Sequence, residues 1–133
     1  MSSKPLLYLC VKVNWRKGRM ANVYKSIIDS DATTNDKVIY TCPAETVALV
    51  KSISAYNAHA SASADWILKI YDSSSTNTYA YKKIASVATA TKKEFLEGDE
   101  STLLVLEASD AIKFNTSVTS ATLFISVLQQ DRT

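Results

Sequence analysis

Glycine, proline, cysteine and histidine are all scarce in this chain. Its 133 residues include two glycines, two prolines, two cysteines and one histidine. Two glycines exclude a glycine-rich phosphate-binding loop, which needs several at close spacing. The cysteines, Cys10 and Cys42, are too few for a disulfide framework and lack zinc-site or redox spacing, so we interpret both as unlinked thiols.

The shortage of histidine argues against nucleophilic catalysis. A serine or cysteine nucleophile needs a base, and no acid or amide is spaced to orient His59 within "AYNAHASAS". The segment that starts at Asp29 lacks both the glycine and the final glutamate of a calcium loop. The remaining carboxylates gather among lysines around a predicted turn, as in a solvated loop, and not as a glycosidase pair. We therefore predict no enzymatic activity, no cofactor and no metal. The clustered carboxylates are Glu94, Glu97, Asp99, Glu100 and Glu107.

Long apolar runs are also missing. A membrane-spanning helix needs about 20 consecutive apolar residues, and every run here is far shorter. The apolar stretch at residues 6–11 is broken by Lys12 and followed by basic residues, where a signal peptide would have small residues. The chain is 47% apolar and 21% charged, which is typical of a globular domain. We predict no membrane contact and no export signal.

The net charge of +2 conceals an uneven distribution along the chain. Residues 1–19 carry +5 and the remainder carries −3. We interpret residues 1–19 as a basic N-terminal arm that contacts an acidic partner, or as an extension upstream of a start at Met20. A nucleic-acid partner is disfavoured because the body has no basic patch to extend the footprint. The basic residues of this leader are Lys4, Lys12, Arg16, Lys17 and Arg19.

What the sequence does contain is a series of β-prone segments between residues 20 and 133. Turn-forming residues separate them about every 8–12 residues, which is typical of a sandwich or barrel of short strands. We predict a single all-β domain at 20–133: an antiparallel β-sandwich, jelly-roll-like, with eight or nine short strands. The expected strands are 22–28, 37–42, 46–56, 65–71, 78–84, 87–95, 102–106, 111–114 and 121–128.

Alternation along the strands predicts the core. We expect the odd-numbered positions of 121–128 and the even-numbered positions of 65–71 to share one core between two sheets. Tyr79 and Tyr81 alternate in the same way, so we expect them to pack inward as well. We expect the segment 87–95 to be a polar edge strand, with a short helical turn at 91–98 as the alternative, since "KKEFLEG" ends in glycine. The predicted shared core comprises Trp66, Leu68, Ile70, Leu123, Ile125 and Val127.

The segment "YTCPAETVALVKSIS", residues 40–54, combines a proline with an apolar run that contains one lysine. Proline has no amide donor, so Pro43 fits a turn or a strand end. Alternation places Val47, Leu49, Lys51 and Ile53 on one face. Because glycine is so scarce, we expect Asn, Asp and Ser to supply the unusual backbone angles of the turns.

From Met20 onward, this chain resembles small β-sandwich structural proteins of tailed bacteriophages. The shared features are "MANVYKSI", "VIYTCPAETVALVKSIS" (of the type "LYTCPAGTTAIVKSI"), "DWILKIYDSSS", a middle segment containing "LVLEASDAIKF", and "ATLFISVL". The most specific piece is "LVLEASDAIKF", a strand, a tight Ala-Ser-Asp turn and a returning strand. Glu45 stands where the family has glycine, and residues 1–19 have no counterpart.

The resemblance implies a non-enzymatic head decoration or other virion-associated protein, assembled in the host cytoplasm. Its partners would be the major capsid protein or other virion proteins, and a homotrimer suits three-fold sites on a shell. The proline segment would then be a rigid corner, with Lys51 facing solvent or a neighbouring subunit. Candidate contacts are Lys12, Arg16, Lys17, Arg19 and Lys51. A tail, baseplate or fibre component and a carbohydrate-binding module remain the alternatives.

Overall fold

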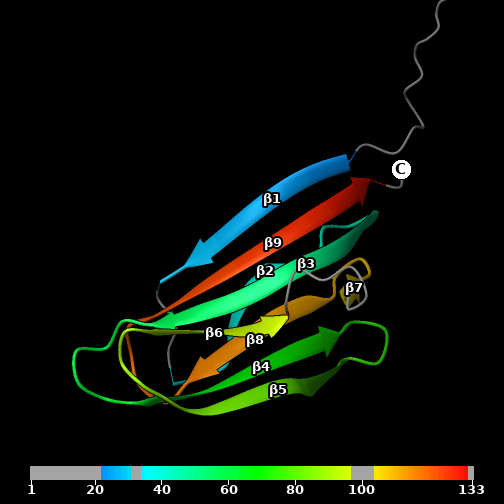
Figure 1. Cartoon of the computed structure of the whole chain (residues 1–133). Coiled ribbons are helices and arrows are strands. Elements are labelled where there is room, and N and C mark those ends of the chain that lie inside the picture. The colour runs from blue at the N-terminus through cyan, green and yellow to red at the C-terminus, as the bar shows by residue number, and fades with distance from the viewer. Residues whose placement is uncertain (1–21, 31–33, 97–103, 132–133) are drawn as a thin grey trace, which may run out of the picture.

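The computed structural model describes residues 22–30, 34–96 and 104–131, which form nine β-strands and no helix (Figure 1). The strands make two antiparallel sheets that pack face to face, so the predicted all-β antiparallel sandwich is confirmed. Within the described ranges, no helix is available to cross a membrane. The strands are β1 (Asn22–Asp29), β2 (Lys37–Thr41), β3 (Thr46–Asn57), β4 (Ala64–Asp72), β5 (Asn77–Val87), β6 (Thr91–Leu96), β7 (Leu104–Leu106), β8 (Ala111–Thr116) and β9 (Ala121–Asp131).

The chain crosses repeatedly between the two sheets. Sheet A has the order β1-β9-β3-β6, with β7 also paired to β3, and sheet B has the order β2-β8-β4-β5. Among the described strands, β4 and β5 are the only consecutive pair joined as a hairpin. In Figure 1, β1 runs along one margin of the molecule and β5 along the other. Both are edge strands.

An aromatic cluster lies at the centre of the sandwich. The ring centroid of Trp66 lies 6.0 Å from that of Phe114 and 6.1 Å from that of Phe95. Phe95 and Phe114 meet edge to face, with centroids 5.9 Å apart. These residues come from β4, β6 and β8, so the cluster joins sheet A to sheet B. Offset and edge-to-face pairs of this kind stabilise beyond the area they bury.

The aliphatic core follows the predicted alternation. Leu68 on β4 and the odd-numbered residues of β9 up to Val127 are buried, and Ile70 is half-buried against the same cluster. Two rows of side chains, one from each sheet, therefore face one another across the interior. The predicted shared core is confirmed, with Ile70 at its margin. The buried residues of β9 are Ala121, Leu123, Ile125 and Val127.

A β-bulge reverses the facing of β3, and the predicted alternation of this strand was wrong for that reason. Val50 pairs with Val127 and Ser52 pairs with Ser126, so Lys51 is an additional residue in the ladder. Before the bulge the even-numbered residues face inward, and after it the odd-numbered residues do. An extra residue in one strand shifts the alternation by one position. Lys51 and Ser52 thus both lie outside, between buried Val50 and Ile53.

Two further expectations about the edges were wrong. Tyr79 and Tyr81 are 53% and 41% exposed, because β5 is the edge strand of sheet B and little covers it. The segment 87–95 is not one strand, since β5 ends at Val87 and β6 begins at Thr91. The turn between them includes Ala90 with a positive φ of 57°. Of the expected segment, only β6 lies in sheet A, where it forms an edge that carries Lys92 and Lys93.

Turns in this protein use residues other than glycine for left-handed backbone. The described non-glycine residues with positive φ include two serines outside the strands, as expected, and Ser86 within β5, but no asparagine or aspartate. A side chain with a Cβ is strained in this region, so neighbouring contacts must hold each of these turns in place. The residues are Glu45, Thr76, Ser86, Ala90, Ser109 and Ser120.

Candidate docking surfaces

The proline-containing corner and the "EASD" turn lie side by side at one end of the sandwich. The Cys42 amide donates to the carbonyl of Asp110 at 2.8 Å, and the Ser109 amide donates to the carbonyl of Cys42 at 2.9 Å. Pro43 therefore stands where the chain leaves β2 in sheet B to enter β3 in sheet A, as a corner requires. The two most recognisable segments of the sequence form one unit.

Asp110 connects this unit to the β4–β5 loop. One carboxylate oxygen accepts from the backbone amide of Glu107 at 3.0 Å. The other accepts from the amide and the hydroxyl of Ser73, at 2.9 and 3.0 Å. Three donors on one carboxylate fix both loops, since hydrogen bonds to an ionised acceptor are the stronger ones.

Cys42 is buried within the corner and has a structural role. Its Sγ donates to the carbonyl of Thr46 at 3.3 Å, and burial raises the pKa of the Cys42 thiol. A protonated buried thiol is a poor nucleophile. Cys42 is a free thiol, as expected, whereas Cys10 lies outside the described residues.

Tyr40 ties the two sheets together beside the corner. Its hydroxyl on β2 donates to Oε1 of Gln129 on β9 at 2.8 Å. Burial raises the pKa of Tyr40 to about 12. The neutral phenol is therefore the form that the fold stabilises.

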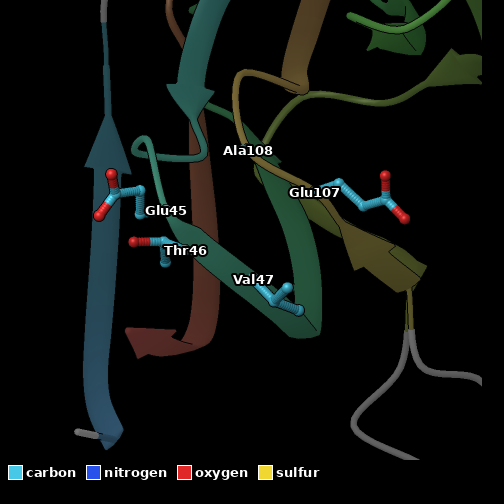
Figure 2. Close-up of a pocket in the computed structure, with 5 residues that line it drawn as sticks. All are labelled: Glu45, Thr46, Val47, Glu107 and Ala108. Atoms are coloured by element: carbon cyan, nitrogen blue, oxygen red, sulfur yellow. The ribbon is translucent and has the colours of Figure 1, made fainter. Parts of the chain in front are cut away.

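A shallow hollow of about 370 Å³ opens at this end of the molecule, lined by Glu45, Thr46, Val47, Glu107 and Ala108 (Figure 2). Figure 2 shows the side chains of Glu45 and Glu107 on opposite sides of the hollow and pointing away from one another. Two carboxylates can share acid–base work only when they flank a common bond. This pair does not.

Glu45 adopts a backbone conformation that favours glycine, with φ of 57°, at the position where the phage proteins that the sequence resembles have glycine. Replacing Glu45 by glycine is expected to raise the free energy of unfolding by up to about 1 kcal/mol, because glycine has no Cβ to strain in this region. Chemical denaturation measures the change. The matched control is Ala44→Gly one residue earlier, where φ is not positive and a loss is expected. A loss for both variants would contradict this explanation of the turn.

The outer face of sheet A is nearly uncharged over β1, β9, β3 and β7, and the charged pair Lys92 and Glu94 on β6 borders it. Tyr24, Leu128, Leu49 and Val105 align directly across β1, β9, β3 and β7. A second row pairs Ile28 with Phe124. Within β1, β9 and β3, Lys51 at the bulge is the one charged residue among the outward positions. We call this surface the A face.

Between the two apolar rows runs a polar trough. Ser26, Ser126 and Ser52 align across β1, β9 and β3. The depression along them has a volume of about 450 Å³ and is bordered by Phe124 and Lys92. The serine hydroxyls of the trough can form hydrogen bonds with the backbone of a partner. The apolar rows on either side of the trough can bury that partner's apolar side chains.

The outer face of sheet B differs in its charge. Lys69 pairs with Asp36 at 2.9 Å, and Nζ of Lys113 lies 5.2 Å from the ring centroid of Tyr71. The hydrogen bond from Lys69 lowers the pKa of the Asp36 carboxyl. Asn115 donates to the same carboxylate at 3.2 Å. This network anchors the loop before β2 and leaves a polar surface.

His59 organises the loop that follows β3. Its Nδ1 accepts from the amides of Ser61 and Ala62 at 3.1 and 3.0 Å. Asn57, which sequence reasoning passed over, is fully buried beneath this loop. In the described ranges, no group of three or more His, Cys, Asp or Glu side chains could hold a metal ion.

The predicted contact residues divide into two groups. Lys51 lies on the A face beside the serine trough and is half-exposed. The leader residues Lys12, Arg16, Lys17 and Arg19 lie outside the described residues, so the basic arm stays a prediction. The acidic residues Glu97, Asp99 and Glu100 also lie outside them.

These features define an all-β sandwich with one charged and one nearly uncharged outer face. No protein-family model and no curated protein matches the chain. It is similar in fold to a chain from the acid-stable capsid of Helicobacter pylori bacteriophage KHP30, with a TM-score of 0.50, 10% identity, and coverage of 86% of this chain and 94% of that one. A chain from the disulfide-linked pili of Bacillus endospore appendages matches with a TM-score of 0.47 and 13% identity, over 86% of this chain and 90% of that one.

Proposed function

We propose that this protein is a non-enzymatic structural component of a tailed-phage virion, a decoration or head-associated protein that stabilises the capsid. The sequence resemblance and the fold it shares with the phage capsid chain support a virion role. The order β1-β9-β3-β6 facing β2-β8-β4-β5 supports a jelly roll, a fold frequent in viral capsid domains.

The observation that carries the proposal is the A face. It exposes apolar side chains from four strands and almost no charge. Isolated exposed apolar residues are common on protein surfaces and need no explanation, but a set from four adjacent strands does. A contiguous apolar surface is typical of an interaction site. Burying it across capsomer junctions would stabilise the shell, because opening the shell would first have to break those contacts. Lys51 would face an acidic group of the capsid protein.

Binding of the purified protein to undecorated shells tests this proposal. Phe124→Asp, on the A face, is expected to weaken binding at least about tenfold, because the charge would have to be buried in the contact. The matched control is Tyr79→Asp, an exposed aromatic of β5, which should bind like the parent. If the parent protein does not bind undecorated shells, the proposed decoration role is wrong. Binding to tail assemblies instead would favour the tail, baseplate or fibre alternative.

We further propose that the protein docks as a trimer or another small closed ring. Each contact with the shell can then be weak, because linked contacts act at a high effective concentration. Native mass spectrometry measures the number of copies. A strictly monomeric protein at the concentrations that decorate shells would contradict the ring.

The leader is expected to contribute nothing to the folding of the body. A chain that begins at Met20 should melt within about 1–2 °C of the full chain, since residues 40–127 supply a large buried core of their own. If the leader contacts the capsid, its removal should weaken shell binding and reduce the salt dependence of that binding. A large loss of thermal stability would make the leader part of the fold.

The second candidate function is a carbohydrate-binding module, because two tyrosines are exposed. Tyr79 and Tyr81 protrude from the edge strand β5, and aromatic side chains on exposed strands can stack on sugar rings. Glycan-array binding by the isolated protein, abolished by Tyr79→Ala, would favour this function over decoration. A protein that binds shells but binds no glycan would contradict the carbohydrate-binding function.

A further inference from the structure

The edges of the two sheets differ in how they are protected. An edge strand offers unpaired backbone groups to other chains, and proteins block such edges with bulges, lysines, prolines or short strands. Among the described strands, the path ends are β1 and β6 in sheet A and β2 and β5 in sheet B. Three of these four carry blocking features.

β2, β5 and β6 are irregular. The pairing of β2 shifts register between Val38 and Tyr40, and Pro43 follows that strand. The pairing of β5 shifts register twice, and that of β6 shifts once. The last two strands also carry adjacent lysines. These are Lys82 and Lys83 on β5, and Lys92 and Lys93 on β6.

β1 has none of these features. It pairs with β9 through eight consecutive residues, Asn22 to Asp29, without a register shift. It contains no proline and a single lysine, Lys25. Three of its side chains are large, apolar and well exposed: Val23 at 47%, Tyr24 at 75% and Ile28 at 64%. At about 3.4 Å per residue, the edge of β1 that no described strand covers is roughly 27 Å long.

We propose that β1 is the edge through which two copies of this chain pair, antiparallel and across a two-fold axis, so that sheet A continues from one copy into the other. A second copy fits better than an unrelated strand because β1 is self-complementary. Antiparallel pairing of identical strands closes at two copies, whereas parallel pairing would leave an edge open for further addition. The proposal deepens the virion role. It makes the small closed assembly a two-fold dimer, or a ring that contains two-fold axes, in place of a plain trimer.

The side chains select a register centred on Ser26. In that register Tyr24 faces Ile28 of the second copy and Ile28 faces its Tyr24, and aromatic–β-branched pairs stabilise antiparallel strands. Lys25 lies diagonal both to the second copy's Asp29, which already pairs with Lys37 at 3.1 Å, and to its Lys25, so the apolar pairs and not the charges favour this register. Shifting the centre by one residue to Lys25 would place the two lysines opposite one another, which is destabilising.

The same register extends the A face. A two-fold axis perpendicular to the sheet keeps the outer faces of both copies on one side. The row formed by Leu128 and Tyr24 then continues into Ile28 and Phe124 of the second copy. The serine trough continues likewise through Ser26. One apolar, nearly uncharged surface would thus span two chains, which doubles the area available for docking.

Disulfide cross-linking tests the register directly. Directly opposed residues on antiparallel strands have Cα atoms about 4.5–5.5 Å apart, which a disulfide can bridge. The full chain with Ser26→Cys in a Cys10→Ser background is therefore expected to form a covalent dimer under mild oxidation. The matched control is Ser126→Cys, an exposed serine on the same face but one strand inward. Its partner would lie about 14 Å away, three strand spacings, and should not cross-link.

Three outcomes would overturn the proposal. Equal cross-linking of the Ser26→Cys and Ser126→Cys chains would indicate random collision. A Ser26→Cys chain that stays monomeric, with half of the β1 amides exchanging freely with solvent, would leave the edge unoccupied. A monomeric chain with all of those amides protected would place another segment on β1. Each outcome is independent of shell binding, so failure here and failure of the decoration role are distinguishable.

Edge variants supply a second readout. Ile28→Lys places a charge opposite Tyr24 of the second copy and should weaken self-association at least about tenfold in sedimentation equilibrium. Because Ile28 is mostly exposed, the melting temperature at low concentration should stay unchanged. The control Tyr81→Lys on β5 should leave self-association as in the parent. An equal effect of both variants would contradict the assignment to β1.

Discussion

Replacing Phe114 by alanine is expected to lower the free energy of unfolding by about 3–5 kcal/mol, the usual cost of truncating a fully buried phenylalanine. Phe114 is completely buried, and its ring contacts both Trp66 and Phe95 across the two sheets. The cavity would open at the only described place where aromatic rings from both sheets meet. Native stability of small domains is about 5–15 kcal/mol, so much of it would be lost.

Phe124→Ala is the matched control for this prediction. It deletes the same atoms from the neighbouring β9 strand, where Phe124 lies on the A face and is 37% exposed. A loss of no more than about 1 kcal/mol is expected, because solvent already reaches the ring and fills the vacated space. Urea denaturation followed by tryptophan fluorescence measures both variants. Similar losses for the two would contradict the placement of Phe114 on the inner face of sheet B and of Phe124 on the outer face of sheet A.

Replacing Asn57 by alanine is expected to cost about 2–4 kcal/mol. Its Nδ2 donates to the carbonyls of Ala62 and Val87 at 3.1 and 2.9 Å, and its Oδ1 accepts from the amide of His59 at 3.0 Å. Asn57 is fully buried, so alanine would leave backbone groups without partners inside the protein, and each such group costs about 1–3 kcal/mol. The β3–β4 loop and the turn after β5 would loosen together.

Asn115→Ala is the control that separates the effect of burial from the effect of losing hydrogen bonds. The Asn115 amide donates to the carbonyl of Thr34 at 2.9 Å and to Asp36 at 3.2 Å, but both bonds are exposed. Water replaces such partners, so a loss below about 1 kcal/mol is expected. Thermal melting compares the two variants, and hydrogen exchange of residues 58–63 should rise only in Asn57→Ala. An Asn57→Ala protein as stable as the parent would contradict the anchoring role.

Much of the fold was predictable because strand alternation and turn residues act locally. The alternation of "ATLFISVL" identified Leu123, Ile125 and Val127 as inward-facing, and β9 is regular against β1. β3 was not predictable in the same way, since a bulge at Lys51 leaves no clear mark in the sequence. Val50 and Ile53 both face inward although they are three residues apart, because pairing with β9 fixes the register on each side of the bulge.

The sequence also did not reveal which strands lie at the edges of the sheets or which polar residues are buried. Tyr79 and Tyr81 alternate as core residues do, but whether a strand is central or at an edge depends on the order of strands in the sheet. Asn57 ends an apolar strand and looked like the start of a polar loop. Its burial follows from Val87, which is 30 positions away in sequence and accepts its hydrogen bond. The A face likewise emerges only when β1, β9, β3 and β7 are aligned.

The most direct test of the virion role is a cryo-EM map of the intact phage particle that carries this protein. The account predicts density for a two-sheet sandwich on the outside of the head, present in hundreds of copies as icosahedral symmetry requires. The A face should lie against the capsid protein, with Lys51 at the contact. Absence of the sandwich from the head, or its presence only in the tail at a few dozen copies or fewer, would contradict the decoration role.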